Sequence, residues 1–367
     1  MHRSRRPVIR TVGIRTAGAG AALLLLTVAC ARPAEAPAGT GGTGGTGAGQ
    51  QVQSTTGADG KLCTAETYNG GVPKLDLKTA TVGFAQSEKE ANPFRITETE
   101  SIKEEAAKRG IKLITTNAQS DLNKEIADIQ SMIAQGAKAL IISPLNSEGL
   151  DPALKAAQDA KVPIMTIDRL LTSKTACTDY IGWTGSDFVE QGKRAADAMI
   201  TATGDKGNVA ILLGASGVNV TVDRTQGFKD QLLAKKSGLK VVAEQTGDFT
   251  REKGRAVTEQ LVSANPDISA IYAENDEMAL GAVAALKAQG KQPGQVKIIT
   301  IDGTQGAVQG IVDGWIAGVI ESNPRFGPLA FQALEDFYSG KGVPAKTIIA
   351  DKEYTQQNAK AELANAY

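Results

Sequence analysis

Residues 139–169 read ALIISPLNSEGLDPALKAAQDAKVPIMTIDR. The stretch contains two apolar runs, 139–143 and 162–167, and each has the length and β-branched content of one buried strand. A more polar segment separates the runs, and Asp168 and Arg169 follow the second run directly. Near-continuous apolar strands are typical of parallel sheets that helices cover on both faces. The stretch therefore predicts an α/β fold.

The same alternation of apolar runs and helical segments continues along the chain from residue 79. The further strand runs are 80–85, 112–116, 208–213, 239–244, 270–273, 296–301 and 318–321. The helical segments, recognised by apolar positions three and four residues apart, include 94–109, 122–135, 187–201, 223–234, 251–264 and 277–289. Gly110, Gly136 and Gly290 stand where helix C-terminal caps are expected. The number of runs predicts two parallel sheets, each with about four to six strands.

Composition and charge exclude several classes of function. The chain has 367 residues, of which 41% are hydrophobic and 22% charged, enough for two domains with large cores. It carries 40 basic and 40 acidic residues, so no excess of positive charge points to nucleic acid as a partner. The only histidine is His2. If the N-terminus is removed after export, the mature protein lacks any imidazole, and this excludes Ser-His-Asp and Cys-His catalysis and histidine-ligated zinc.

The N-terminus is typical of an exported protein. Residues 1–29 combine arginines with an apolar run, 17–29, that is too short and too rich in glycine for a permanent membrane span, and they predict a signal peptide. The sequence Thr-Val-Ala-Cys that ends at Cys30 resembles the bacterial lipobox, so we expect a lipid on Cys30. The alternative is an ordinary cleavage site with a chance cysteine. The Arg5-Arg6 pair leaves both the twin-arginine and the general export route open.

Residues 30–77 are rich in Gly, Thr, Ala and Pro, and they predict a flexible tether after the lipidated cysteine. A glycine run can also cradle phosphate, but that requires a preceding strand and a following helix, and the sequence predicts neither here. Two more cysteines, Cys63 and Cys177, form an even number in an exported chain. We expect a disulfide between them, with two buried free thiols as the alternative.

Polar and aromatic side chains follow most of the predicted strands. Because ligands of open parallel sheets gather at the carboxyl ends of the strands, these side chains are the candidate binding residues. Carboxylates and amides accept the protons of sugar hydroxyls, arginine and amide groups donate to them, and flat rings cover the C–H faces of a sugar. The mixture therefore predicts a carbohydrate site. For single positions such as Asp248, Asn275 and Asp302 the alternative is a helix N-cap or a surface ion pair.

Five motifs, in order along the chain, carry a family resemblance. They are Asn92-Pro93-Phe94, Val162-Pro163-Ile164 leading to Asp168-Arg169, Gly247–Gly254, Asn275–Ala282 and Ile301–Thr304. From about residue 79 to the C-terminus the chain resembles the ribose and galactofuranose branch of bacterial periplasmic sugar-binding proteins, the receptors of ABC importers. The resemblance implies two Rossmann-like parallel-sheet lobes joined by a three-segment hinge. The implied N-terminal lobe is 78–186 plus 323–349, and the C-terminal lobe is 187–322 plus 350–367.

The resemblance also implies a set of ligand-binding residues. Phe94 and Phe249 would stack on a sugar ring, and the remaining members would bind its hydroxyls: Asn92, Arg95, Asp168, Arg169, Arg224, Asn275 and Asp302. Arg95 stands where ribose binders have a second phenylalanine, and Ser322 and Asn323 stand where they have a glutamine. These departures favour a furanose-type hexose or a pentose such as galactofuranose, arabinose or ribose. No calcium loop is visible, and no metal, cofactor or catalytic residue is expected.

We therefore expect a monomeric lipoprotein on the extracytoplasmic face of the cell membrane. Its two lobes would close on a monosaccharide by hinge motion, and the closed form would deliver the sugar to the permease of an ABC transporter. The alternatives are a receptor for a chemosensory or kinase system, a glycoside-processing enzyme that uses Asp168, Asp223 or Asp302, and a sugar-responsive repressor. A repressor of this kind carries DNA-binding helices at its N-terminus, whereas this sequence predicts a signal peptide and a tether there. Trp183 is expected in the core, with a place in the cleft as the alternative.

Overall fold

A computed structural model describes residues 50–57 and 60–367 of the chain. The predicted signal peptide, the predicted lipidation site Cys30 and the glycine-rich part of the predicted tether lie outside these residues.

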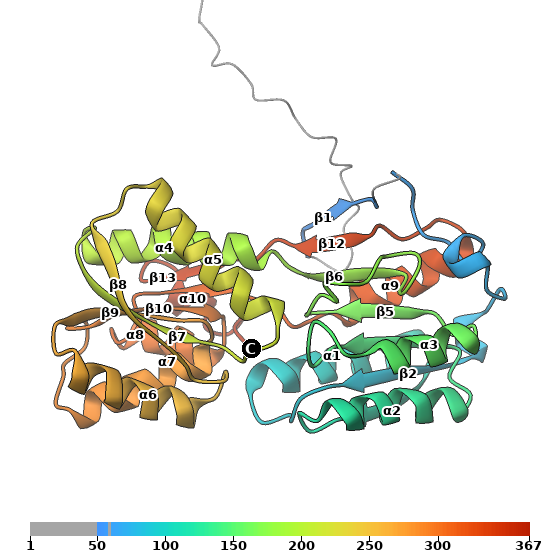
Figure 1. The fold of residues 1–367 in the computed structure, drawn as a ribbon, viewed down its shortest axis with the longest axis horizontal. Helices are drawn as coiled ribbons and strands as arrows, with labels where there is room; N and C mark the ends of the chain where they lie inside the picture. Colours follow the sequence, from blue (N-terminus) through green and yellow to red (C-terminus); the bar gives the residue numbers. More distant parts are fainter. Residues whose placement is uncertain (1–49, 58–59) are drawn as a thin grey trace, which may run out of the picture. The chain divides into compact units, whose positions relative to one another are not determined.

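The first sheet has seven strands in the order β1-β12-β6-β5-β4-β2-β3 (Figure 1). All its pairings are parallel except that of β1 with β12. The strands are β1 (Val52–Thr55), β2 (Thr81–Gln86), β3 (Lys112–Asn117), β4 (Ala139–Ser143), β5 (Ile164–Ile167), β6 (Gly182–Ser186) and β12 (Lys346–Ile349). We call this sheet and the helices packed on it the N-terminal lobe.

The second sheet has six strands in the order β13-β11-β10-β9-β7-β8, of which only β13 is antiparallel to its neighbour. The strands are β7 (Gly207–Leu213), β8 (Leu239–Thr246), β9 (Ile268–Ala273), β10 (Lys297–Asp302), β11 (Gly318–Glu321) and β13 (Glu353–Thr355). We call this sheet and its helices the C-terminal lobe. The chain passes between the sheets after β6, after β11 and after β12, so the predicted pair of parallel-sheet lobes with a three-segment hinge is confirmed.

Helices cover both faces of each sheet and bury a core there. On the first sheet, α1 (Pro93–Arg109) and α9 (Gly327–Ser339) pack on one face, and α2 (Leu122–Ala134) and α3 (Asp151–Asp159) on the other. On the second sheet, α4 (Phe188–Thr203) and α5 (Asn219–Ala234) share one face. The opposite face holds α6 (Arg251–Ala264), α7 (Asp276–Ala288), α8 (Gln305–Val312) and α10 (Ala359–Glu362). With both faces covered, the strands are the near-continuous apolar runs that the sequence displays.

Side-chain caps fix where several of these helices begin. Asn92, Asp187 and Asn275 each precede a helix and accept a hydrogen bond from the backbone N–H three residues later. Because the first backbone N–H groups of a helix have no partner within it, each cap stabilises its helix by about 1 kcal/mol. Gly110 ends α1 in the left-handed conformation, as predicted.

The predicted tether is wrong for its described part, residues 50–57 and 60–77. β1 adds an antiparallel edge strand to β12, and a disulfide joins Cys63 to Cys177. Tyr68 and Leu77 are buried in the core of the N-terminal lobe. The low-complexity composition ends near residue 49, and the residues after it have enough apolar and hydrogen-bonding groups to pack.

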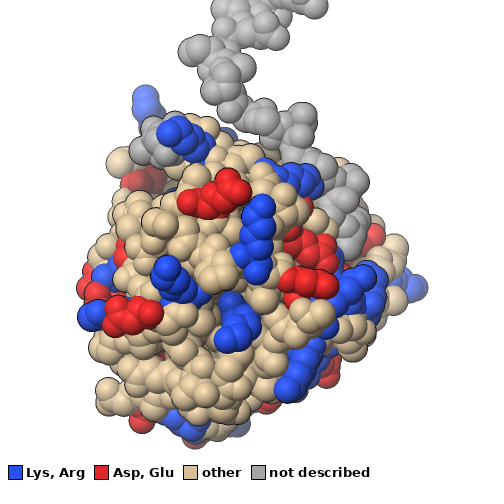
Figure 2. All heavy atoms as spheres, turned by 90° about the vertical axis from the view of Figure 1, so that its right-hand side faces the viewer, with Lys and Arg blue, Asp and Glu red and all other residues tan. Residues whose placement is uncertain are grey.

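Charges of both signs are mixed on the surface. Figure 2 shows one face of the molecule, where basic and acidic side chains alternate among the described residues without a field of one sign. This distribution agrees with the equal numbers of basic and acidic residues in the sequence. Within the same described residues, no helix has the length and apolar composition needed to cross a membrane.

Candidate functional site

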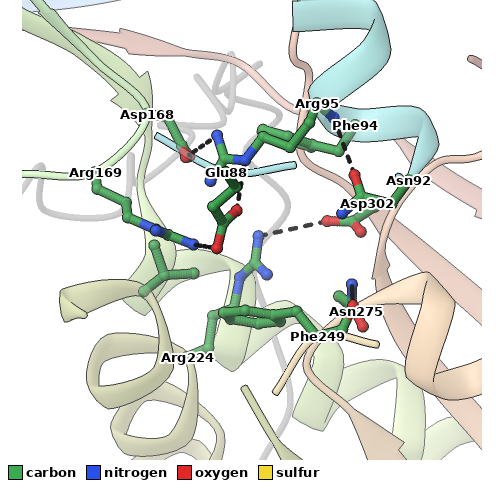
Figure 3. Close-up of a pocket in the computed structure, with 11 residues that line it drawn as sticks. Glu88, Asn92, Phe94, Arg95, Asp168, Arg169, Arg224, Phe249, Asn275 and Asp302 are labelled. Atoms are coloured by element: carbon green, nitrogen blue, oxygen red, sulfur yellow. Dashed lines mark hydrogen bonds and ion pairs between the residues drawn. The ribbon is translucent and has the colours of Figure 1, made fainter. Parts of the chain in front are cut away.

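A cavity lies where strand ends of the two lobes meet (Figure 3). The residues that line it are Glu88, Asn92, Phe94, Arg95, Asp168, Arg169, Val220, Arg224, Phe249, Asn275 and Asp302. All nine residues that the sequence predicted to bind ligand are among them. Glu88 and Val220 were not predicted.

A network of two arginines and three acids forms the wall of the N-terminal lobe. The Arg95 guanidinium donates to Glu88 Oε2 at 2.7 Å and to Glu98 Oε2 at 2.8 Å, and it lies 2.7 Å from Asp168 Oδ2. Arg169 donates to the second oxygen of Glu88 at 2.8 Å. Glu88 therefore holds both arginines at once, through one oxygen each (Figure 3).

These contacts set the charge of the network. Burial alone would raise the pKa of the Glu88 carboxyl, but Arg169 and Arg95 outweigh burial and lower it to about 2. Burial raises the pKa of Glu98 despite Arg95, because this side chain is fully enclosed. Ionised Glu88 thus faces both arginines, and the Asp168 carboxyl lies beside Arg95.

Asp168 is held by the backbone as well as by Arg95. It follows β5 with φ at +61°, a left-handed conformation that a residue other than glycine rarely adopts. The indole Nε1 of Trp183 donates to the Asp168 carbonyl at 2.9 Å and supports this conformation. Trp183 is buried and does not line the cavity, so it serves the core, as expected.

Arg224 of α5 is the main donor on the wall of the C-terminal lobe. Its Nε donates to Gln191 Oε1 at 3.0 Å, and one terminal nitrogen donates to the Glu274 carbonyl at 2.5 Å. The other terminal nitrogen lies 3.8 Å from Asp302 Oδ1. The N–H groups left over on the terminal nitrogens are available to a ligand in the cavity.

Asp302 ends β10 beside a second buried acid, Asp276. Burial and the neighbouring Asp276 raise the pKa of Asp302 well above its usual range, although Arg224 opposes them. Asp276 accepts from the backbone N–H groups of Gly303 and Thr304 at 2.9 and 2.7 Å and so orders the loop after β10. Asp302 has φ at +142°, so its carboxyl is placed by a strained backbone, as is common at binding sites.

Two aromatic rings complete the cavity from opposite lobes. Phe94 lies in the first turn of α1, with its ring 6.2 Å from that of Tyr367 and edge-on to it. Phe249 follows β8 with φ at +58° and packs over Gly214. A Cβ at position 214 would lie 2.0 Å from the Phe249 ring, so glycine is required there.

Asn92 and Asn275 combine two roles. Each side-chain carbonyl caps a helix, and each residue also lines the cavity. The Asn275 Nδ2 donates to the Phe249 carbonyl at 3.1 Å and ties the aromatic loop to α7. Asn275 is therefore a helix N-cap, the alternative considered above, and it also lines the cavity. Asp248 is absent from the lining and pairs with Lys253.

The two lobes also touch beside the cavity. The backbone N–H of Asn219 donates to Ser147 Oγ at 2.8 Å, and Asn219 Oδ1 accepts from the Leu170 N–H at 3.1 Å. Ser147 and Leu170 belong to loops of the N-terminal lobe, whereas Asn219 begins α5. These bonds join the two lobes beside the cavity.

Among the described residues, no group of three or more His, Cys, Asp or Glu side chains is arranged to hold a metal ion. The acids of the cavity instead have arginine or backbone partners.

Comparison with known proteins places the chain in a family. The profile described as "Periplasmic binding protein domain" matches residues 82–342, which cover most of both lobes. The chain belongs to this family. Among curated relatives, the galactofuranose-binding protein YtfQ of Escherichia coli (strain K12) is 34% identical, over 77% of this chain and 90% of that protein. The ribose import binding protein RbsB of Bacillus subtilis (strain 168) is 37% identical, over 74% of this chain and 86% of that protein.

Solved structures of the family agree with this assignment. The arabinose-transporter binding protein of Shewanella sp. ANA-3, solved with α- and β-L-arabinofuranose, superposes with a TM-score of 0.74 at 34% identity. The superposition covers 78% of this chain and 95% of that one. The resemblance inferred from the five motifs is therefore confirmed.

Proposed function

We propose that the protein is an extracytoplasmic receptor of an ABC importer that binds one neutral monosaccharide between its two lobes. The substrate class is a furanose-type hexose or a pentose, such as galactofuranose, arabinose or ribose. Family membership and the ligands named for the relatives support this class.

The observation that carries the proposal is the combination of fixed hydrogen-bonding groups and two aromatic rings around one cavity. Arg95 and Arg169 share Glu88, and Arg224 lies 3.8 Å from Asp302. A neutral polyol needs donors and acceptors in fixed positions together with flat apolar surfaces. Phe94 and Phe249 provide those surfaces from opposite lobes.

The preference for a furanose or pentose rests on Arg95. Its guanidinium is buried and lies on the Phe94 side of the cavity, with its centre 5.1 Å from the ring centroid. A hydrogen-bond donor at this place suits an exocyclic or ring hydroxyl, whereas a second phenylalanine would offer only a flat face. Ser322 and Asn323 do not line the cavity and are not proposed as ligand contacts.

Delivery follows from closure. The sugar contacts both lobes only when they are together, so binding shifts the population toward the closed form. We propose that this form docks on the permease and that a lipid on Cys30 keeps the receptor at the membrane.

Isothermal titration calorimetry of the purified protein against arabinose, ribose, galactose, xylose, glucose and galactofuranose-containing oligosaccharides tests the proposal. We expect one or two of these sugars to bind, and Arg224→Ala to lose at least 100-fold in affinity. Arg255→Ala is the matched control, because Arg255 is an exposed arginine of α6 paired with Glu259. Binding of none of the sugars would contradict the proposal.

A glycosidase activity can be tested separately. Asp168 is paired with Arg95 in the buried network of the N-terminal wall. Asp302 differs, because burial and the neighbouring Asp276 raise its pKa. We expect no release of aglycone from aryl furanosides, and turnover that is lost in Asp302→Asn would indicate a glycosidase instead.

A further inference from the structure

Gln191 lies outside the cavity but contacts one of the residues that line it. It belongs to the first turns of α4 and is 1% exposed. Its Oε1 accepts from the Nε of Arg224 at 3.0 Å. Its Nε2 donates in the opposite direction, to Asp351 Oδ2 at 2.7 Å and to the Glu321 carbonyl at 3.1 Å. The Gln191 carboxamide therefore joins the Arg224 guanidinium to Asp351, and both its oxygen and its nitrogen are hydrogen-bonded.

Asp351 stands where the three chain passages between the lobes meet. It follows β12 in the third passage. Its Oδ1 accepts from Ser186 Oγ at 3.2 Å, at the end of β6 in the first passage. The same oxygen accepts from the Asn323 N–H at 3.3 Å, after β11 in the second passage. The partner of Gln191 is thus the carboxylate that ties the hinge together.

Gln191 also determines which part of Arg224 faces the cavity. With Nε on Gln191 and one terminal nitrogen on the Glu274 carbonyl, the guanidinium plane can rotate little, and its other terminal nitrogen points toward Asp302. Close packing of α4 on α5 makes this possible. A Cβ at Gly192 would lie 2.3 Å from the Arg224 carbonyl oxygen, so only glycine allows the approach.

We propose that Gln191 is a positioning residue that orients Arg224 in the sugar site and couples it to the hinge through Asp351. The proposal deepens the proposed function and rests on it for the sugar. Gln191 acts through Arg224 and never touches the ligand. Without its carboxamide, Arg224 turns more freely in the open protein, and closure has to order it again.

The first test compares Gln191→Met, which keeps the size of the side chain, with Gln226→Met as a matched control. Gln226 is an exposed glutamine of α5 that also bonds a carboxylate, Asp230. We expect Gln191→Met to weaken binding of the sugar at least tenfold and Gln226→Met to leave it unchanged. In an Arg224→Lys background, Gln191→Met is expected to cost less than twofold. An equal loss in both backgrounds would overturn the proposal.

A reciprocal exchange separates positioning from a general packing role. Gln191→Glu keeps an acceptor for Arg224 but removes the donor and places a second carboxylate beside Asp351. Asp351→Asn then supplies an amide donor that can face Glu at position 191, while its carbonyl still accepts from Ser186 and Asn323. We expect each single variant to lose affinity and the double variant to recover part of it, because the bond to the Glu321 carbonyl is not restored. A double variant no better than the worse single would overturn the coupling.

A readout without sugar keeps the two proposals distinguishable. The exchange of the Arg224 Nε–H with solvent can be measured by arginine side-chain NMR. We expect it to accelerate at least tenfold in Gln191→Met and to slow again in the double variant Gln191→Glu/Asp351→Asn. Fast exchange already in the unchanged protein, or no change in Gln191→Met, would overturn the positioning role. If the exchange behaves as expected but no sugar binds the unchanged protein, the proposed function fails and the positioning of Arg224 stands.

Discussion

Glu88 is the residue on which the N-terminal wall of the cavity depends, since each of its oxygens holds one arginine. Glu88→Gln keeps the shape but removes the charge that Arg95 and Arg169 share. Because hydrogen bonds between charged groups contribute about 1.5–3 kcal/mol each, we expect at least a tenfold loss of sugar affinity by calorimetry. Glu90→Gln, an exposed acid of the same loop, is the control. Unchanged affinity in Glu88→Gln would show that the arginines are placed without it.

Glu125 is expected to make stability depend on pH. It is fully buried on α2, and burial raises its pKa from 4.5 to about 7. The folded protein therefore binds a proton that the unfolded chain releases above pH 4.5, so this contribution to stability is lost as the pH rises through 7. The shift corresponds to about 3 kcal/mol. Glu125→Gln should flatten the decline in urea-unfolding free energy between pH 5 and 8.

Glu148→Gln, an exposed acid in the loop after β4, is the control for that measurement and should leave the decline as it is. Other buried acids with raised pKa values, Glu274 and Asp351 among them, add to the same decline. A slope in Glu125→Gln equal to that of the unchanged protein would contradict the assignment to Glu125.

At the residue scale, sequence and structure agree where a motif was available. The nine predicted residues lie at strand ends or in the loops and helices that follow them, and the parallel topology brings these segments together. Glu88 also follows a strand, so the same rule could have identified it. Val220 and Gln191 could not be identified from the sequence, because an apolar residue and a glutamine inside helical patterns give no sign of what they contact.

The pair α4 and α5 positions Arg224, and its close approach depends on glycine. A Cβ at Gly227 would lie 2.1 Å from the Val189 carbonyl oxygen, which belongs to backbone and cannot move aside. We expect Gly227→Ala to destabilise the protein by about 1–3 kcal/mol, measured by urea unfolding, and to weaken sugar binding.

Gly306→Ala is the matched control for this helix pair. Position 306 is also helical, but its Cβ would meet the end of the Leu280 side chain at 3.1 Å, which can adjust. Since alanine favours a helix over glycine by about 1 kcal/mol, this change should be neutral or stabilising. Equal destabilisation by both changes would contradict the argument from close packing.

At the element scale, predictions succeeded where the apolar pattern was clear and missed the strands β1, β6, β12 and β13. The helix predicted over 251–264 is α6 without any shift, and the strand predicted over 139–143 is β4. β6 was missed because its sequence, GWTGS, has two glycines and one large apolar residue. β1, β12 and β13 have only three or four residues each, and their pairing depends on distant partners.

For the whole molecule, the bonds between Asn219 and the loops at Ser147 and Leu170 should stabilise the closed form. Asn219→Ala removes the side-chain part of this contact. We expect up to a tenfold increase in the rate of sugar release, measured by stopped-flow fluorescence, with little change in the unfolding temperature of the sugar-free protein. Asn208→Ala is the control, because Asn208 pairs with Asp267 inside the C-terminal lobe. Equal release rates would contradict a role of this contact in closure.

The architecture of two lobes was predictable at this scale, because the number of strand runs and five ordered motifs indicate it. The extent of the N-terminal segment that packs on the first lobe could not be predicted. Its composition suggested a tether up to residue 77, whereas β1 and the Cys63–Cys177 disulfide hold residues 50–57 and 60–77 on the first lobe. Pairing at a sheet edge is set by the partner strand, β12, which lies almost 300 residues later in the chain.

We expect residues from both lobes to enclose one neutral sugar. A crystal structure of the protein with the sugar that binds best in calorimetry would show whether they do. We predict the sugar ring between Phe94 and Phe249, with its hydroxyls on Asp168, Arg169, Arg224, Asn275 and Asp302. A sugar bound elsewhere on the protein, with this cavity free of it, would contradict the account.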